Sequence, residues 1–197
     1  MKRFFTALGF LTALSLPVSA QDFEKGLAAA QAGDFATALQ EWTPLAEAGD
    51  VDGQFNLGLM YSKGAGVPQD YKEAVKWYRL AAEQGDAIAQ FNLGTMYDEG
   101  QGVLQDYKEA VKWYRLAAEQ GFASAQNNLG VKYEIGRGVL KDKVMAHMWY
   151  NIASANGHSK AGEWRDKIEG QMTQADVSKA QAMARECINS GYKKCGY

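Results

Sequence analysis

Asparagine recurs three times at intervals of 36 residues, as Asn56, Asn92 and Asn128, each time directly before a Leu-Gly pair. A carboxamide offers two N–H donors and an acceptor oxygen, which match the backbone of an extended peptide whatever its sequence. If the segments that carry these residues lie side by side, the amides form a row. We therefore expect this row to bind a peptide backbone. The alternative is that each amide satisfies a polar group of the fold itself.

Two neighbouring sets of residues recur with the same interval. Residues four positions apart share a face of a helix. The residues four positions after each asparagine are therefore expected to lie beside the row: Met60, Met96 and Lys132. Their types predict a groove that is apolar at one end and basic at the other. A second set lies two residues before each asparagine, about 200° around a helix, and is expected to make contacts between repeats: Gln54, Gln90 and Gln126.

Residue types that carry catalysis or bind metals are few. The chain has two histidines, His147 and His158, and two cysteines, which argues against a zinc site or a catalytic triad. Ser190 and Lys193 match the S-x-x-K motif of β-lactamases and penicillin-binding proteins. They lie in a glycine-rich tail without the other motifs of that class, so we treat the match as chance. The sequence predicts no catalytic residue, no metal and no cofactor.

The composition further limits the class of protein to which the chain can belong. The 197 residues are 47% hydrophobic and 22% charged, as in globular proteins. A net charge of −2 argues against a nucleic-acid-binding protein that depends on overall basicity. Abundant Ala, Leu, Lys and Glu with only three prolines favour helix over strand.

Internal repetition indicates which elements position the asparagines. Residues 50–85 and 86–121 are identical at 28 of 36 positions, and a diverged copy covers 122–157. A shortened copy without the connecting loop covers 22–49, and residues 158–197 do not repeat. Tryptophans repeated at helical positions are expected to be packing anchors: Trp42, Trp77, Trp113 and Trp149.

Each full copy predicts two helices joined by a glycine-rich loop. In residues 50–85, Leu57 and Tyr61 belong to the apolar stripe of the first helix, and Gly64 is expected to end it in a left-handed conformation. Asp70 is expected to cap the second helix, with Glu73 completing a capping box. Because one hairpin cannot bury its stripe alone, we predict an all-α fold, a right-handed α-solenoid of stacked helix–loop–helix repeats with a C-terminal helical cap.

The cap is assigned to residues 158–197, which contain two further helical patterns. Cys187 and Cys195 lie in and after the second of them. In an oxidising compartment a disulfide between them would pin the C-terminal tail. Free thiols or a redox pair are the alternatives, although the spacing is not that of a C-x-x-C motif.

Residues 1–20 have the pattern of a signal peptide, with Lys2 and Arg3 before an apolar run and small residues before a cleavage site between Ala20 and Gln21. An uncleaved anchor is the alternative, which the short apolar run disfavours. We expect a periplasmic or secreted protein with no stable membrane insertion after cleavage.

The pattern A-x-x-x-L-G-x-x-Y-x-x-G-x-G-V-x-x-D-x-x-x-A-x-x-W-Y-x-x-A-A-x-x-G, which residues 89–121 follow, resembles the Sel-one-like repeat, a relative of the tetratricopeptide repeat. Residues 50–85 depart from it at Gly53, where the pattern has alanine. The resemblance implies an α-solenoid that binds proteins or peptides, commonly as an adaptor. It also implies frequent export among bacterial members, and an asparagine at the similar position that holds extended peptides.

These observations predict an adaptor of the cell envelope that binds a protein or peptide in its concave groove, and no nucleic acid. The alternatives are a peptidoglycan-related binding role or a weak β-lactamase-like hydrolase, and a structural module that forms homo-oligomers. The near-identity of two copies favours the adaptor and the homo-oligomeric module over the peptidoglycan-related or hydrolase role, because catalysis needs one unique arrangement of residues whereas a row of binding residues needs repetition.

Overall fold

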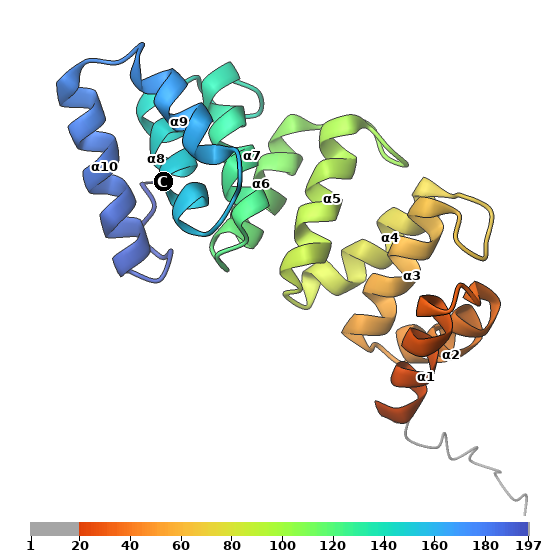
Figure 1. Ribbon diagram of the computed structural model, residues 1–197. Coiled ribbons are helices and arrows are strands. Elements are labelled where there is room, and N and C mark those ends of the chain that lie inside the picture. Colours follow the sequence, from red (N-terminus) through yellow and green to blue (C-terminus); the bar gives the residue numbers. More distant parts are fainter. Residues whose placement is uncertain (1–19, 197) are drawn as a thin grey trace, which may run out of the picture.

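The computed structural model describes residues 20–196, which form an all-helical chain without a strand (Figure 1). The helices run in the order α1 (Ala20–Gln31), α2 (Phe35–Glu47), α3 (Val51–Lys63), α4 (Tyr71–Glu83), α5 (Ala87–Glu99), α6 (Tyr107–Ala118), α7 (Ala123–Ile135), α8 (Lys143–Ala155), α9 (Ala161–Glu169) and α10 (Gln174–Asn189). The predicted signal segment 1–20 lies, up to residue 19, outside the described residues. Within them, no helix combines the length and the apolar character that crossing a membrane requires.

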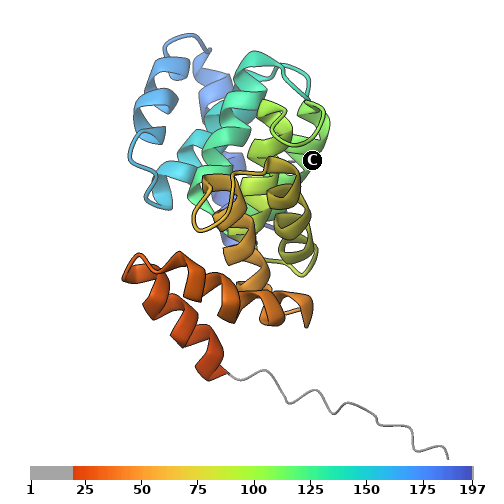
Figure 2. The same ribbon diagram turned by 90° about the vertical axis from the view of Figure 1, so that its right-hand side faces the viewer.

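Consecutive helices pair into hairpins, and the hairpins stack. Helices α1 to α8 form successive pairs, and the second helix of each pair packs against the first helix of the next. Figure 2 shows the stack rising from α1 and α2 at the bottom to the last helices at the top. Both α9 and α10 pack on α8 and cover the C-terminal end of the stack. The predicted right-handed α-solenoid with a helical cap is confirmed.

Glycine and aspartate set the helix ends in the full repeats. Gly64, Gly100 and Gly136 end the first helices with φ values of 68°, 71° and 74°, the left-handed conformation that the sequence predicted. At the start of α3 and α5, an aspartate carboxylate accepts the backbone N–H of the residue three positions on. Phe122 occupies this position before α7 and supplies no side-chain cap.

The capping box predicted for the second helices is only half present. The Asp70 carboxylate accepts the backbone N–H groups of Lys72 and Glu73, as an N-cap should. The backbone N–H of Asp70 itself donates to the carbonyl oxygen of Tyr61 at 3.0 Å. Because that donor is already used, Glu73 does not return to it and pairs with Lys76 instead.

Buried glutamines join each hairpin to the one before it. The side chains of Gln54, Gln90 and Gln126 donate to carbonyl oxygens in the last turn of the preceding hairpin at 3.1, 3.0 and 3.0 Å. Each also accepts an N–H from an amide side chain that follows the second helix of its own hairpin: Gln84, Gln120 and Asn156. The predicted role between repeats is confirmed, and the repeated geometry fixes the angle at which hairpins meet.

The connecting loops also interlock with the preceding hairpin. A Cβ atom added to Gly102 would lie 2.2 Å from the carbonyl oxygen of Tyr71, and one added to Gly138 would lie 2.1 Å from that of Tyr107. Both glycines have positive φ. Each loop therefore lies directly on the first turn of the previous second helix, and only glycine permits this approach.

Aromatic side chains fill the space between the helices. The four repeated tryptophans are buried, as predicted for packing anchors: Trp42, Trp77, Trp113 and Trp149. Gly58, Gly94 and Gly130 on the first helices lie against the tyrosine that follows the tryptophan in the same repeat. Residue size is therefore matched across every hairpin.

A disulfide joins Cys187 in α10 to Cys195 in the tail, and both residues are buried. The tail between them turns back on the repeats, where the Tyr192 hydroxyl donates to Asn156 at 3.0 Å. Because Asn156 also donates to Gln126, the tail is joined by hydrogen bonds to the last of the buried glutamines.

Replacing both cysteines by alanine is expected to lower the free energy of unfolding by about 2 kcal/mol, because the disulfide closes a short loop in the unfolded chain. Urea denaturation followed by circular dichroism measures the loss. Reductant should lower the stability of the wild type to a similar extent and leave the variant unchanged. Equal midpoints for the variant and the oxidised wild type would show that the disulfide does not stabilise the fold.

Candidate peptide-binding surface

The three asparagines occupy equivalent positions on the first helices α3, α5 and α7, and each is partly exposed. The Nδ2 atom of Asn56 donates to the carbonyl oxygen of Asp52 at 2.8 Å, one turn back in the same helix. This bond orients the amide and uses one of its two N–H donors. The alternative interpretation, in which the amide satisfies a polar group of the fold, therefore applies to one N–H of Asn56. The other N–H donor and the amide oxygen belong to a partly exposed side chain.

Asn56 lies on the wall of a pocket of about 340 Å³ at the N-terminal end of the stack. The pocket is formed by α1, α2 and α3 with the first residues of the following loop, and its lining is mainly apolar: Leu27, Ala30, Gln31, Phe35, Trp42, Asn56, Leu59, Met60, Lys63 and Ala65. A cavity of this size and lining accommodates a large apolar side chain. The sequence indicated Asn56 but not the pocket, because the contribution of α1 depends on how the shortened first repeat packs.

Asn128 belongs to a polar group between the second and third full repeats. The Tyr114 hydroxyl donates to the Thr95 hydroxyl at 3.3 Å and also forms a hydrogen bond with Asn128. Burial raises the pKa of Tyr114 to about 12, although both hydrogen bonds oppose the shift. The phenol is therefore neutral at physiological pH and acts as a fixed hydrogen-bonding group.

Met60, Met96 and Lys132 do not form the predicted surface gradient. They are 3%, 4% and 5% exposed, because the neighbouring hairpins cover them. Met60 reaches the wall of the pocket, whereas Met96 belongs to the core around Trp113. A shared helix face correctly relates these residues to one another, but it does not reveal what packs on that face.

Lys132 is held in an ion pair that the sequence analysis did not identify. Its ammonium group pairs with the Asp98 carboxylate of the preceding repeat and lies 5.3 Å from the ring centroid of Tyr107. Asp98 is largely buried as well. The equivalent pair one repeat earlier is Ser62 and Met96. The sequence signal for this ion pair was the simultaneous change of Ser62 to Asp98 and of Met96 to Lys132 between adjacent copies.

The S-x-x-K match has a structural role in the tail. The Ser190 hydroxyl donates to the carbonyl oxygen of Cys187 at 2.8 Å and accepts the backbone N–H groups of Lys193 and Lys194. A hydroxyl engaged in this way stabilises the turn after α10 and is not presented as a nucleophile.

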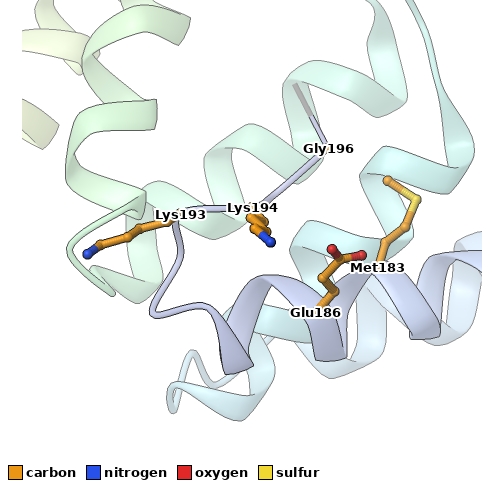
Figure 3. A pocket seen from close by; sticks show the side chains of 5 residues that line it. All are labelled: Met183, Glu186, Lys193, Lys194 and Gly196. Carbon is orange, nitrogen blue, oxygen red and sulfur yellow. The ribbon is translucent and has the colours of Figure 1, made fainter.

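Figure 3 shows the pocket beside this turn, of about 390 Å³, with the Lys193 side chain directed away from the carboxylate of Glu186. Its lining contains no serine, threonine, cysteine or histidine: Met183, Glu186, Lys193, Lys194 and Gly196. His147 lies elsewhere, fully buried in α8, with Nε2 3.0 Å from the Glu169 carboxylate of α9. Within residues 20–196, no group of three or more His, Cys, Asp or Glu side chains is arranged to hold a metal ion.

Stacked helical hairpins with equivalent polar side chains on their first helices define a helical-repeat protein of the α-solenoid class. The sequence model of the Sel1 repeat matches residues 51–86, 87–122 and 123–158, one residue later than the divisions inferred from the sequence alone. The chain belongs to the Sel1 repeat family, whose members are typically non-enzymatic scaffolds for protein interactions.

Solved structures place the fold in the same family. A Sel1 repeat protein from Oxalobacter formigenes is 43% identical, with a TM-score of 0.61 over 66% of this chain and 98% of that one. The c5321 protein, a protective antigen of uropathogenic Escherichia coli with an SLR fold, is 30% identical, with a TM-score of 0.61 over 87% of this chain and 46% of that one. Cysteine-rich protein B of Helicobacter pylori shares the fold at 20% identity and a TM-score of 0.53. No curated protein matches.

Proposed function

We propose that this Sel1 repeat protein is an adaptor of the cell envelope that binds an extended segment of a partner protein along the first helices of its repeats. The observation that carries the proposal is the apolar pocket with Asn56 in its wall. An apolar cavity next to a backbone-binding amide supplies both requirements for binding an extended peptide, an anchor for one side chain and hydrogen bonds for the main chain.

The repeated geometry supports extension of this site along the stack. Asn92 and Asn128 lie at the same helical position as Asn56 and are also partly exposed. An extended peptide offers a backbone donor and acceptor at every residue, so it can use equivalent amides in succession. Support for location in the envelope comes from the signal pattern in residues 1–20 and from the Cys187–Cys195 disulfide, which suits an oxidising compartment.

The triple substitution Asn56→Ala, Asn92→Ala and Asn128→Ala is expected to weaken partner binding at least about tenfold, since each lost hydrogen bond contributes of order 1 kcal/mol. Helical content should be unchanged. A photoreactive amino acid at Leu59, in the pocket wall, should capture the partner from an envelope fraction for identification by mass spectrometry. Affinities of the wild type and the triple variant for that partner are then measured by calorimetry.

Two controls make the result specific. Asn189→Ala changes an exposed asparagine at the end of α10 and should leave binding intact. A photoreactive group at Lys76, on the exposed face of α4, should not capture the same partner. If the triple variant binds the captured partner as tightly as the wild type does, the asparagines are structural and the proposal is wrong.

A further inference from the structure

Differences between the two nearly identical repeats are confined to the first helix and the connecting loop. Residues 69–85 and 105–121, which include the second helices α4 and α6, have the same sequence. Exposed side chains on these helices therefore keep the same type in both copies: Lys72 and Lys108, Leu80 and Leu116, Glu83 and Glu119. Exposure to solvent alone thus does not explain where the copies differ.

Contacts within the fold account for some of the differences. At Gly53, where the second copy has alanine, an added Cβ atom would lie only 2.9 Å from the backbone nitrogen of Ala46. At Asp98, where the first copy has serine, the carboxylate pairs with Lys132 of the third copy. Both differences adapt a copy to its neighbour in the stack.

Three other differences lie on the face of the first helices that carries the asparagines. They are four residues before, three after and seven after each asparagine, positions that lie within about 60° of it around a helix. The pairs of residues are Asp52 and Ile88, Leu59 and Thr95, and Lys63 and Glu99. None of these side chains is buried. We call the surface that they form with Asn56 and Asn92 the variable face.

The variable face has opposite charges at the equivalent ends of α3 and α5. Of the described residues that line the apolar pocket, only Lys63 is charged. Burial and, to a smaller extent, the charges of nearby acids such as Glu99 raise the pKa of Tyr114, whose hydroxyl bonds to Asn128. Glu99 therefore lies near the next asparagine of the row. Within residues 20–196, neither Lys63 nor Glu99 takes part in an ion pair, so both charges are available to a ligand.

Neighbouring acids do not neutralise Lys63. Asp52 is in the first turn of α3 and Lys63 in the last, about 16 Å apart along the helix axis. This separation exceeds the Debye length of about 8 Å at physiological ionic strength. The carboxylate of Asp34, which precedes Phe35 of the pocket lining, accepts hydrogen bonds from Thr37 rather than from Lys63.

We infer that the variable face selects the sequence of the bound segment. A large apolar side chain enters the pocket, a carboxylate beside it pairs with Lys63, and a basic side chain about three residues further along pairs with Glu99. This selection rests on the proposed function, since the segment must follow the asparagine row. The spacing follows from the packing of Leu59 of α3 on the core cluster that contains Leu93 and Met96 of α5. Helices in contact lie about 8–10 Å apart, which an extended chain spans in about three residues.

Peptide display tests this selection on residues 21–197, which contain all three core clusters. Random linear peptides are selected on the wild type and on the variant Lys63→Glu with Glu99→Lys. Each substitution introduces the residue that the adjacent repeat carries at the equivalent position, so both helices should remain intact. Peptides selected on the wild type should have an acid beside a large apolar residue and a base further along. Peptides selected on the variant should have the two charges exchanged.

Affinities measured by fluorescence anisotropy give the size of the effect. A peptide selected on the wild type should bind each single variant at least about fivefold more weakly, because a repulsive pair replaces an attractive one. The same peptide with its two charges exchanged should recover this loss on the double variant. Lys72→Glu with Glu83→Lys is the matched control, because it exchanges the same charges on the exposed face of α4 and should leave binding unchanged.

Different results distinguish failure of this selection from failure of the proposed function. Selected peptides may depend on the three asparagines, as tested with the triple alanine variant, yet lack the acid and base or bind the charge-exchanged variant equally well. The charge selection is then wrong and the proposed function stands. An equal loss of affinity in the α4 control also contradicts the selection. If no peptide is enriched on the wild type, both the selection and the proposed function are wrong.

Discussion

Asp98→Ser is expected to lower the free energy of unfolding by about 2–4 kcal/mol, and adding Lys132→Met is expected to restore most of that loss. The single substitution leaves the Lys132 ammonium buried without its counter-ion, because the neighbouring hairpins cover this side chain. The double substitution reproduces the pair Ser62 and Met96, which occupies the equivalent positions one repeat earlier. Packing of that pair is already compatible with the same hairpin geometry.

A double-mutant cycle in urea, followed by circular dichroism, measures this coupling. Lys132→Met alone should cost less than Asp98→Ser, since Asp98 retains some contact with water. The two losses should therefore not add in the double variant. Additive losses would mean that the ion pair is not the reason for these residue types, and that Lys132 is accommodated by its other contacts.

Gly138→Ala is expected to cost at least about 3 kcal/mol, of which 1–2 kcal/mol arise from the left-handed backbone and the rest from a steric clash. The added methyl group would lie 2.1 Å from the Tyr107 carbonyl oxygen, and backbone cannot move aside as a flexible side chain does. Displacement of the loop should also separate the second and third full repeats.

Gly85→Ala is the matched control for this prediction. Gly85 also has positive φ, but nothing lies within 4 Å of an added Cβ atom. Its cost should be limited to the backbone contribution of about 1–2 kcal/mol. Thermal and urea denaturation of both variants separate the two effects. Equal destabilisation by the two substitutions would show that the loop is free to shift away from α6.

Local signals in the sequence predicted most of the fold. Helical spacing, the glycine at each left-handed helix end and the aspartate N-caps act within a few residues, so their effect does not depend on the rest of the chain. The inter-repeat role of Gln54 and its equivalents was also predictable, because every repeat offers the same partner to the next. Near-identity of the copies therefore specified both the hairpin and its stacking.

The surface was less predictable than the fold, for a physical reason. Periodicity shows which residues share a helix face, but burial depends on what a neighbouring hairpin places there. Met96 and Lys132 were expected on an open groove and are covered. The pocket beside Asn56 depends on α1, which belongs to the most diverged copy. The reciprocal half of the capping box failed because Tyr61 takes the donor of Asp70 from a distance of nine residues.

The ion pair between Asp98 and Lys132 also bears on how a chain with two nearly identical segments assembles in order. During folding, α7 meets two almost equivalent docking faces, one on residues 50–85 and one on residues 86–121. Omission of one segment would produce a shorter, misassembled array, a characteristic failure of repeat proteins. In that arrangement Lys132 would face Ser62 and lack a counter-ion. A single charge pair thus selects the full-length register over the skipped one.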